Sequence, residues 1–228
     1  MKTILSFILI GSVVFVSQAQ NNDWQCIQTN TPDYSYSHYN NEYGHITNGV
    51  YYSIESALQN PEKVTILDLS NQHIAQLDYR LSRLNQLEVL VLKNNQLTAL
   101  PYQICSLPKL RIIDVSNNSL DEIPYQIGEL KALEILILKG NNVTALPYQI
   151  SQLSHLKLLD ISHNYLTELP YQLSRLTNLK KIYAGYNEIK EIPYQFAALK
   201  NLRILDLTHN NNVEIPYQLK HNPIHIIQ

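Results

Sequence analysis

The histidine, cysteine, serine and aspartate side chains are the groups of this chain with a capacity for metal binding or nucleophilic catalysis. Its 228 residues include eight histidines and two cysteines, and none of these has the sequence spacing of a zinc site. The six glycines form no phosphate-binding loop. The polar side chains that do recur at a constant spacing are a phenol and an amide. A Tyr-Gln dipeptide returns every 23 residues, each time after a proline. These dipeptides begin at Tyr102, Tyr125, Tyr148, Tyr171, Tyr194 and Tyr217.

With Tyr79, these residues form a tyrosine row of seven members. Two interpretations are open. Rings at a constant spacing can stack into a ladder, each pair adding about 0.5–1.5 kcal/mol. Alternatively, phenols and amides form an adhesive surface suited to carbohydrate or to another copy of the chain. We favour the stacked ladder.

The same 23-residue period organises the aliphatic residues. Leu87 through Leu107 reads L-x-x-L-x-L-x-x-N-x-L-x-x-L-P-x-x-I-x-x-L. A fixed period of this size is typical of a solenoid, in which stacked units bury a continuous core that no unit can bury alone. We number the units as coils 1 to 7; they begin near Val64, Leu87, Leu110, Leu133, Leu156, Leu179 and Leu202.

This pattern resembles the leucine-rich repeat proteins, in particular the 23-residue subclass of many bacterial and plant proteins. The resemblance covers about residues 50 to 222. It implies an α/β solenoid, a right-handed coil of about seven repeats with a parallel β-sheet on its concave face. It also implies binding rather than catalysis, with no cofactor. The residues agree, because stacked repeats offer no pocket in which Ser, His and Asp can be paired.

One asparagine recurs in every coil after the first, and Gln72 stands at this position in coil 1. An amide supplies two donors and an acceptor, so a stacked row of amides can satisfy the backbone of a buried turn. We therefore expect a structural role, facing inward, for Asn95, Asn118, Asn141, Asn164, Asn187 and Asn210.

The two ends of the chain differ from the repeats. Residues 1–19 have the pattern of a secretory signal peptide, with Lys2, an apolar stretch from Ile4 to Val16, and a cleavage site before Gln20. This predicts a protein exported to the periplasm, the cell surface or the medium, and no membrane insertion of the mature chain. Residues 20–50 form a polar leader rich in Tyr and Asn. It is either flexible or part of a cap, or else a sticky aromatic arm.

Short caps are expected at both ends of the solenoid. Residues 51–63 predict an N-terminal cap with a helix that Ser53 begins and Pro61 ends. The repeats then occupy residues 64–222, and residues 223–228 predict a short, irregular edge strand. An exposed edge of this kind would allow a homodimer.

The two cysteines leave two alternatives open. Export permits a disulfide between Cys26 and Cys105, which would join the leader to coil 2. Cys105 also stands where the other coils have Ser, Gly or Ala, so it can simply be the small residue that fits there.

The net charge gives no support to two classes of partner. The chain has 17 basic and 19 acidic residues, a net charge of −2. This balance is too mild to argue for nucleic acid or an anionic membrane as a partner, so neither is expected.

The outward positions of the strands predict a contact face. One row is aliphatic from Ile66 to Leu158, and an exposed apolar strip usually marks a contact site.

Coil 6 departs from the rows, with Lys181 for an aliphatic residue and Tyr183 for Asp or Val. Aromatic and basic residues together are typical of an interface hot spot, although drift near the end of a solenoid is the alternative. His163 and His209, which flank Tyr186 on the adjacent coils, are expected about 10 Å apart, too far for one metal ion. The candidate partner-binding residues are Asp160, His163, Lys181, Tyr183, Tyr186, Asp206 and His209.

The sequence thus predicts a secreted or cell-surface recognition module, bacterial in type and not an enzyme, that binds a protein partner through its concave face. A carbohydrate-binding or adhesive surface protein that uses the tyrosine row is the alternative. An enzyme inhibitor is neither favoured nor excluded.

Overall fold

The computed structural model describes residues 6–10, 13–17, 24–26, 49–220 and 223–228. The chain divides into two units, Met1–Thr47 and Asn48–Gln228. In the first unit, β1 (Ser6–Ile10), β2 (Val13–Ser17) and β3 (Trp24–Cys26) form an antiparallel sheet in that order. The segment predicted as a signal peptide, residues 1–19, therefore contains β1 and β2. Residues 27–48, most of the predicted leader, lie outside the described residues.

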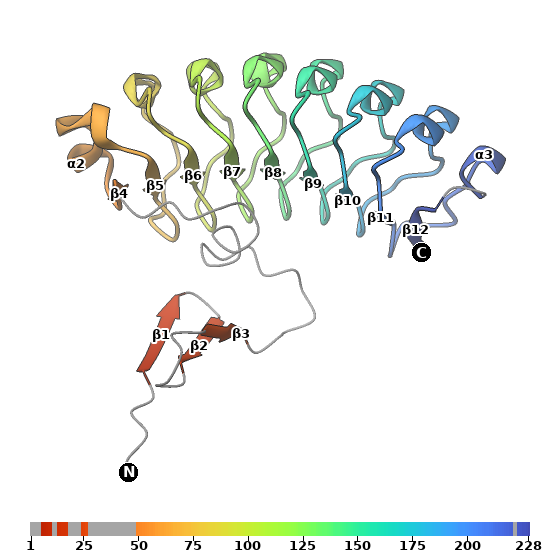
Figure 1. Ribbon diagram of the computed structural model, residues 1–228, viewed down its shortest axis with the longest axis horizontal. Coiled ribbons are helices and arrows are strands. Elements are labelled where there is room, and N and C mark those ends of the chain that lie inside the picture. Colours follow the sequence, from red (N-terminus) through yellow and green to blue (C-terminus); the bar gives the residue numbers. More distant parts are fainter. Residues whose placement is uncertain (1–5, 11–12, 18–23, 27–48, 221–222) are drawn as a thin grey trace, which may run out of the picture. The chain divides into compact units, whose positions relative to one another are not determined.

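The second unit is a solenoid with a single nine-stranded parallel sheet along its inner side (Figure 1). Seven of the strands, β5 to β11, lie one in each coil and have three residues each. Neighbouring coils pair in register, as Leu90 does with Ile113. The strands are β4 (Val50–Tyr51), β5 (Ile66–Asp68), β6 (Val89–Val91), β7 (Ile112–Asp114), β8 (Ile135–Ile137), β9 (Leu158–Asp160), β10 (Lys181–Tyr183), β11 (Ile204–Asp206) and β12 (His225–Ile227).

The outer side of the solenoid carries one short 3-10 helix in each of coils 1 to 6, beginning at the tyrosine of the row (Figure 1). In coils 2 to 6 the preceding proline is the N-cap residue, since its fixed φ suits a helix start and it has no N–H to leave unpaired. These helices are η2 (Tyr79–Arg83), η3 (Tyr102–Ser106), η4 (Tyr125–Glu129), η5 (Tyr148–Gln152), η6 (Tyr171–Arg175) and η7 (Tyr194–Ala198). Coil 7 has the α-helix α3 (Tyr217–Lys220) at the same place.

The core lies between the sheet and the helices, and the periodic aliphatic side chains fill it. Leu133, Leu136 and Ile150 of coil 4 are all fully buried, as are their equivalents in the adjacent coils. One cluster of buried residues runs from Ala57 to Ile224. The predicted solenoid with a parallel sheet is therefore confirmed.

The asparagine row has the inward, bridging role that the sequence predicts. In Asn141, Nδ2 donates to the carbonyl oxygens of Val115 (3.1 Å) and Leu138 (2.8 Å). Its Oδ1 accepts a hydrogen bond from the backbone N–H of Leu120 (3.0 Å) in the preceding coil. One amide thus serves backbone groups of two coils, which otherwise would be buried without partners.

The N-terminal end has the predicted helical cap. The helix α2 (Ile54–Gln59) begins after Ser53, whose Oγ accepts from the backbone N–H of Ser56, and the 3-10 helix η1 (Pro61–Lys63) follows it. The strand β4 adds a further parallel strand beside β5. At the other end, β12 pairs with β11 and forms the C-terminal edge of the sheet.

The aliphatic row on the outward side of the strands is buried, and the expectation of an exposed apolar strip is wrong. Ile66, Val89, Ile112 and Ile135 are only 1–4 % exposed. Each has an in-register aliphatic neighbour, and branched side chains about 4.8 Å apart lie in contact with one another. The partly exposed outward positions lie further along the sheet, in β10 and β11.

Candidate functional site

The outward residues of β9, β10 and β11 come together on the sheet. Tyr183 pairs in register with Asp160 on one side and with Asp206 on the other. Lys181 lies two residues earlier on the same face, between Leu158 and Ile204. Four of the predicted contact residues are therefore direct neighbours, and they place a phenol between two carboxylates.

The two carboxylates of this row are anchored to the backbone. Asp160 Oδ1 accepts from the N–H of Ser162 (2.9 Å), and Asp206 Oδ1 accepts from the N–H of Thr208 (3.0 Å). Coil 6 has Gly185 at the position of Ser162 and Thr208. A Cβ on Gly185 would lie 2.6 Å from Thr208 Oγ1, so the glycine permits the close approach of coil 7.

The other three predicted residues form an aromatic stack just beyond the C-terminal ends of β9, β10 and β11. The rings of His163 and Tyr186 are 4.1 Å apart with an interplanar angle of 11°, and those of Tyr186 and His209 are 3.9 Å apart at 9°. All three side chains are exposed, and Tyr186 retains 45 % of its accessible surface. The stack therefore presents three aromatic edges side by side.

The electrostatics favour a neutral ring at the start of the stack. Partial burial lowers the pKa of His163, and the nearby charge of Lys139 lowers it further, against an opposing effect of Asp160. His163 therefore remains neutral at a pH at which an ordinary histidine begins to gain a proton, and a neutral imidazole stacks as an aromatic ring.

The backbone conformation behind the stack was not predicted. His163, Tyr186 and His209 all have a left-handed φ of 54–56°. This conformation is uncommon for His and rare for Tyr, whereas Asn and Gly adopt it readily. The equivalent residues of coils 1 to 4 are Asn, Asn, Asn and Gly. These residue types are the signal in the sequence from which the left-handed backbone could have been predicted.

The tyrosine row forms a second surface, on the outer side of the solenoid. Its seven rings are 52–71 % exposed, and within the described residues no ring contact joins two members of the row. The stacked ladder that we favoured from the sequence is therefore wrong. Each ring belongs to the first residue of its helix, and more than half of its surface is exposed to solvent.

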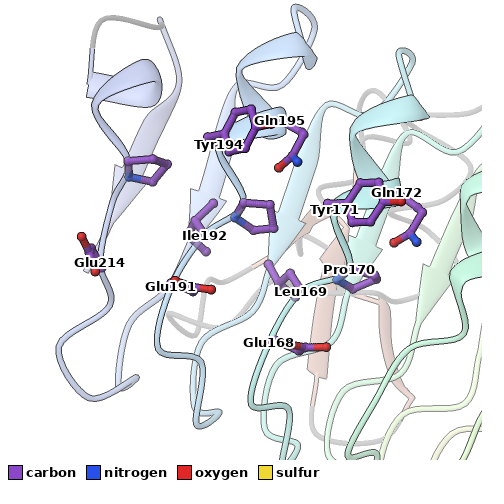
Figure 2. A pocket seen from close by; sticks show the side chains of 12 residues that line it. Glu168, Leu169, Pro170, Tyr171, Gln172, Glu191, Ile192, Tyr194, Gln195 and Glu214 are labelled. Carbon is purple, nitrogen blue, oxygen red and sulfur yellow. The ribbon is translucent and has the colours of Figure 1, made fainter.

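A groove runs beside this row at coils 5 to 7, with a volume of about 570 Å³. Tyr171 and Tyr194 line it with their glutamines, together with one glutamate from each of these coils (Figure 2). These glutamates are Glu168, Glu191 and Glu214. The groove thus combines aromatic, amide and carboxylate groups.

Cys105 is a free thiol in the structure. The side chain of Cys26 lies outside the described residues, so a disulfide between the two cysteines stays a prediction. Cys105 is 1 % exposed, and burial raises its pKa to about 12. A buried thiol of this kind is an inert packing residue. The position therefore needs a small side chain, as the Ser, Gly and Ala of other coils indicate.

Within the described residues, no three or more His, Cys, Asp or Glu side chains gather where they could hold a metal ion. In the same part of the chain, every helix is too short or too polar to cross a membrane.

The comparisons with known proteins define the class. A model of the leucine-rich repeat region matches residues 103–214, and a second leucine-rich repeat model matches residues 62–120. The chain is a leucine-rich repeat protein. No curated protein sequence matches it.

Solved structures show the same fold. A leucine-rich repeat protein of Leptospira interrogans is 28 % identical over 80 % of this chain and 58 % of its own, with a TM-score of 0.57. An internalin of Listeria monocytogenes is 18 % identical over 78 % of this chain and 51 % of its own, with a TM-score of 0.65. A third structure is the ectodomain of the receptor kinase GASSHO1/SCHENGEN3 from Arabidopsis thaliana, solved in complex with CASPARIAN STRIP INTEGRITY FACTOR 2. It is 29 % identical over 73 % of this chain and 20 % of its own, with a TM-score of 0.62. The chain thus spans little more than half the length of the first two.

Proposed function

We propose that this chain is an exported, non-catalytic module that recognises a protein partner through the concave face of coils 5 to 7. The observation that carries the proposal is the aromatic stack of His163, Tyr186 and His209, which lies beside the carboxylate–phenol row at Tyr183. Interface hot spots are enriched in tyrosine and cluster where polar groups surround them. The plant receptor ectodomain, which has the same fold, is in complex with a partner factor.

The partner is best identified by chemical crosslinking and capture from envelope and host-surface extracts. The double variant Tyr183→Ala/Tyr186→Ala should then bind the captured protein about 30-fold more weakly, from a hot-spot loss of about 2 kcal/mol. Titration calorimetry measures this change. Tyr148→Ala, a 63 % exposed ring on the outer side, is the matched control and should keep full affinity.

A circular-dichroism melt must first show that the double variant is folded. Unchanged affinity in the folded double variant would exclude the concave site, whereas weaker binding in the Tyr148 control alone would move the site to the tyrosine row.

The alternative function is carbohydrate binding or adhesion by the tyrosine row. Exposed rings beside a groove with amides and carboxylates favour it, since sugars bind to aromatic faces and polar edges. The triple variant Tyr125→Ala/Tyr148→Ala/Tyr171→Ala should lose glycan-array signals while its melting temperature stays within a few degrees, because these rings are exposed. A wild-type protein with no glycan signal would rule this function out.

Export and self-association are further parts of the proposal. The pattern of residues 1–19 supports cleavage before Gln20, which the mass of the protein recovered from the envelope or medium checks. The outer edge of β12 would pair with a second copy in a homodimer, and a monomer in sedimentation at micromolar concentration would contradict that.

A further inference from the structure

The residue just before the strand of each coil belongs to a regular row along one flank of the sheet. We call this the flank row: Thr65, Glu88, Arg111, Glu134, Lys157, Lys180 and Arg203. The backbone N–H of each member after the first donates to the carbonyl oxygen of the member before it, at 2.8 Å. Because this hydrogen bond repeats without a break, neighbouring members lie side by side at the spacing of one coil, about 4.8 Å.

Charges alternate along coils 2 to 5 of this row and pair with one another. Arg111 Nη1 and Nε lie 3.4 and 3.1 Å from carboxylate oxygens of Glu88 and Glu134. Lys157 Nζ binds the other oxygen of Glu134. Partial burial by itself would raise the pKa of Glu134, but the hydrogen bonds from Lys157 and Arg111 lower it. A carboxylate between two cations is therefore well held in this row.

The alternation fails at coil 6. An acid after Lys157 would continue it, but the next two members are Lys180 and Arg203, so three cations follow one another. Both residues are exposed, and neither forms an ion pair within the described part of the chain. Residues 170–187 and 192–205 contain no Asp or Glu. Like charges at neighbouring positions of a sheet are destabilising, so this end of the row costs stability in the free protein.

Arg203 is held in place without losing its charge. Its Nη1 donates to the backbone carbonyl oxygens of Lys200 (3.0 Å) and Leu202 (3.4 Å). A guanidinium has five N–H donors, so most of them remain for an anion. Lys180 directly precedes Lys181 of β10, and an anion bound here would therefore lie at the margin of the proposed contact face.

We propose that Lys180 and Arg203 bind a carboxylate side chain of the protein partner, which takes the place in the flank row that Glu134 has in coil 4. The inference rests on the proposed function and names a contact at the margin of the same face. A single carboxylate fits better than a uniform polyanion such as nucleic acid. Asp160 and Asp206 lie on the strands that follow this row and would repel a polyanion.

The test needs no identified partner. Wild-type protein is titrated at low salt with an N-acetylated, C-amidated peptide of four glutamates and, separately, with its glutamine analogue, while NMR follows the backbone amides of Lys180 and Arg203. The glutamate peptide should shift both signals saturably, and the glutamine peptide should bind at least about tenfold more weakly. Salt at about 0.5 M should abolish the shifts, because it screens exposed charges.

The variant Lys180→Glu should have opposite effects on stability and on binding. It restores the alternation of charge, so the melting temperature of the free protein should rise by about 2–4 °C. The same change should weaken binding of the glutamate peptide about tenfold or more. Lys63→Glu makes the same change of charge at an exposed residue of the N-terminal cap and should leave both measurements nearly unchanged.

A lower melting temperature for Lys180→Glu, equal binding of the glutamate peptide by this variant and wild type, or no saturable shift in the wild type would overturn the site. So would tighter binding of inorganic phosphate, or of vesicles that contain phosphatidylglycerol, than of the glutamate peptide. Each of these results is independent of partner capture. A captured partner whose affinity falls in Tyr183→Ala/Tyr186→Ala but not in Lys180→Glu would leave the proposed function standing and remove only the carboxylate contact.

Discussion

Replacing Phe196 with alanine should lower the free energy of unfolding by about 3–5 kcal/mol, the largest loss that we expect from a single substitution in this chain. Phe196 is fully buried in η7. It is the only aromatic residue of its row, in which the other six coils have Leu or Ile. Truncation removes a whole ring and leaves a cavity between stacked coils. Because adjacent coils hold one another in place, the surrounding structure can move only slightly into this cavity.

The same coil also has an unusually small core residue. Ala184, just after β10, is fully buried at a position where the other coils have Leu, Ile or Val. We infer that the large residue in η7 offsets the small one after β10. Phe196→Leu should cost less than Phe196→Ala, and Ala184→Leu in the presence of Phe196 should cost about 1–3 kcal/mol by overpacking.

Urea unfolding followed by circular dichroism measures these changes. If the two positions compensate, the double variant Ala184→Leu/Phe196→Leu should lose less free energy of unfolding than the two single variants lose together. Strict additivity, or a loss below about 1 kcal/mol for Phe196→Ala, would show that the two residues pack independently.

Replacing Asn141 with alanine should cost about 2–4 kcal/mol, the second largest effect. The substitution leaves the N–H of Leu120 and the carbonyl oxygens of Val115 and Leu138 without their amide partner. Asn141 is only 4 % exposed, so water cannot readily replace it, and a buried unsatisfied group costs about 1–3 kcal/mol.

The same urea titration provides the measurement, with Asn178→Ala as the control. Asn178 donates a single hydrogen bond to the carbonyl oxygen of Ser154 (2.8 Å) at an exposed site, so its loss should stay below about 1 kcal/mol. Gln72→Ala, at the exposed terminal position of the same row, should be similarly mild. Equal losses for Asn141 and Asn178 would contradict the bridging role.

The sequence alone determined the repeat and what the repeat implies. The 23-residue period predicted the coils and the inward leucines, and the resemblance to leucine-rich repeat proteins implied the parallel sheet. The structure has each of them. It also predicted the role of Asn141 and the helix that Ser53 begins. These features follow from residue type and spacing within one or two coils, and stacking requires each coil to repeat them.

Only the tertiary structure decided which rows of side chains contact one another and which face solvent. The sequence placed Ile112 on an exposed strip and favoured stacked rings in the tyrosine row, and the structure buries the first and separates the second. The stack at Tyr186 depends on a left-handed backbone that a strand pattern does not show. A period sets how often a side chain returns, but its direction and burial depend on backbone conformation and on the packing of adjacent coils, which are fixed only when the coils lie against each other.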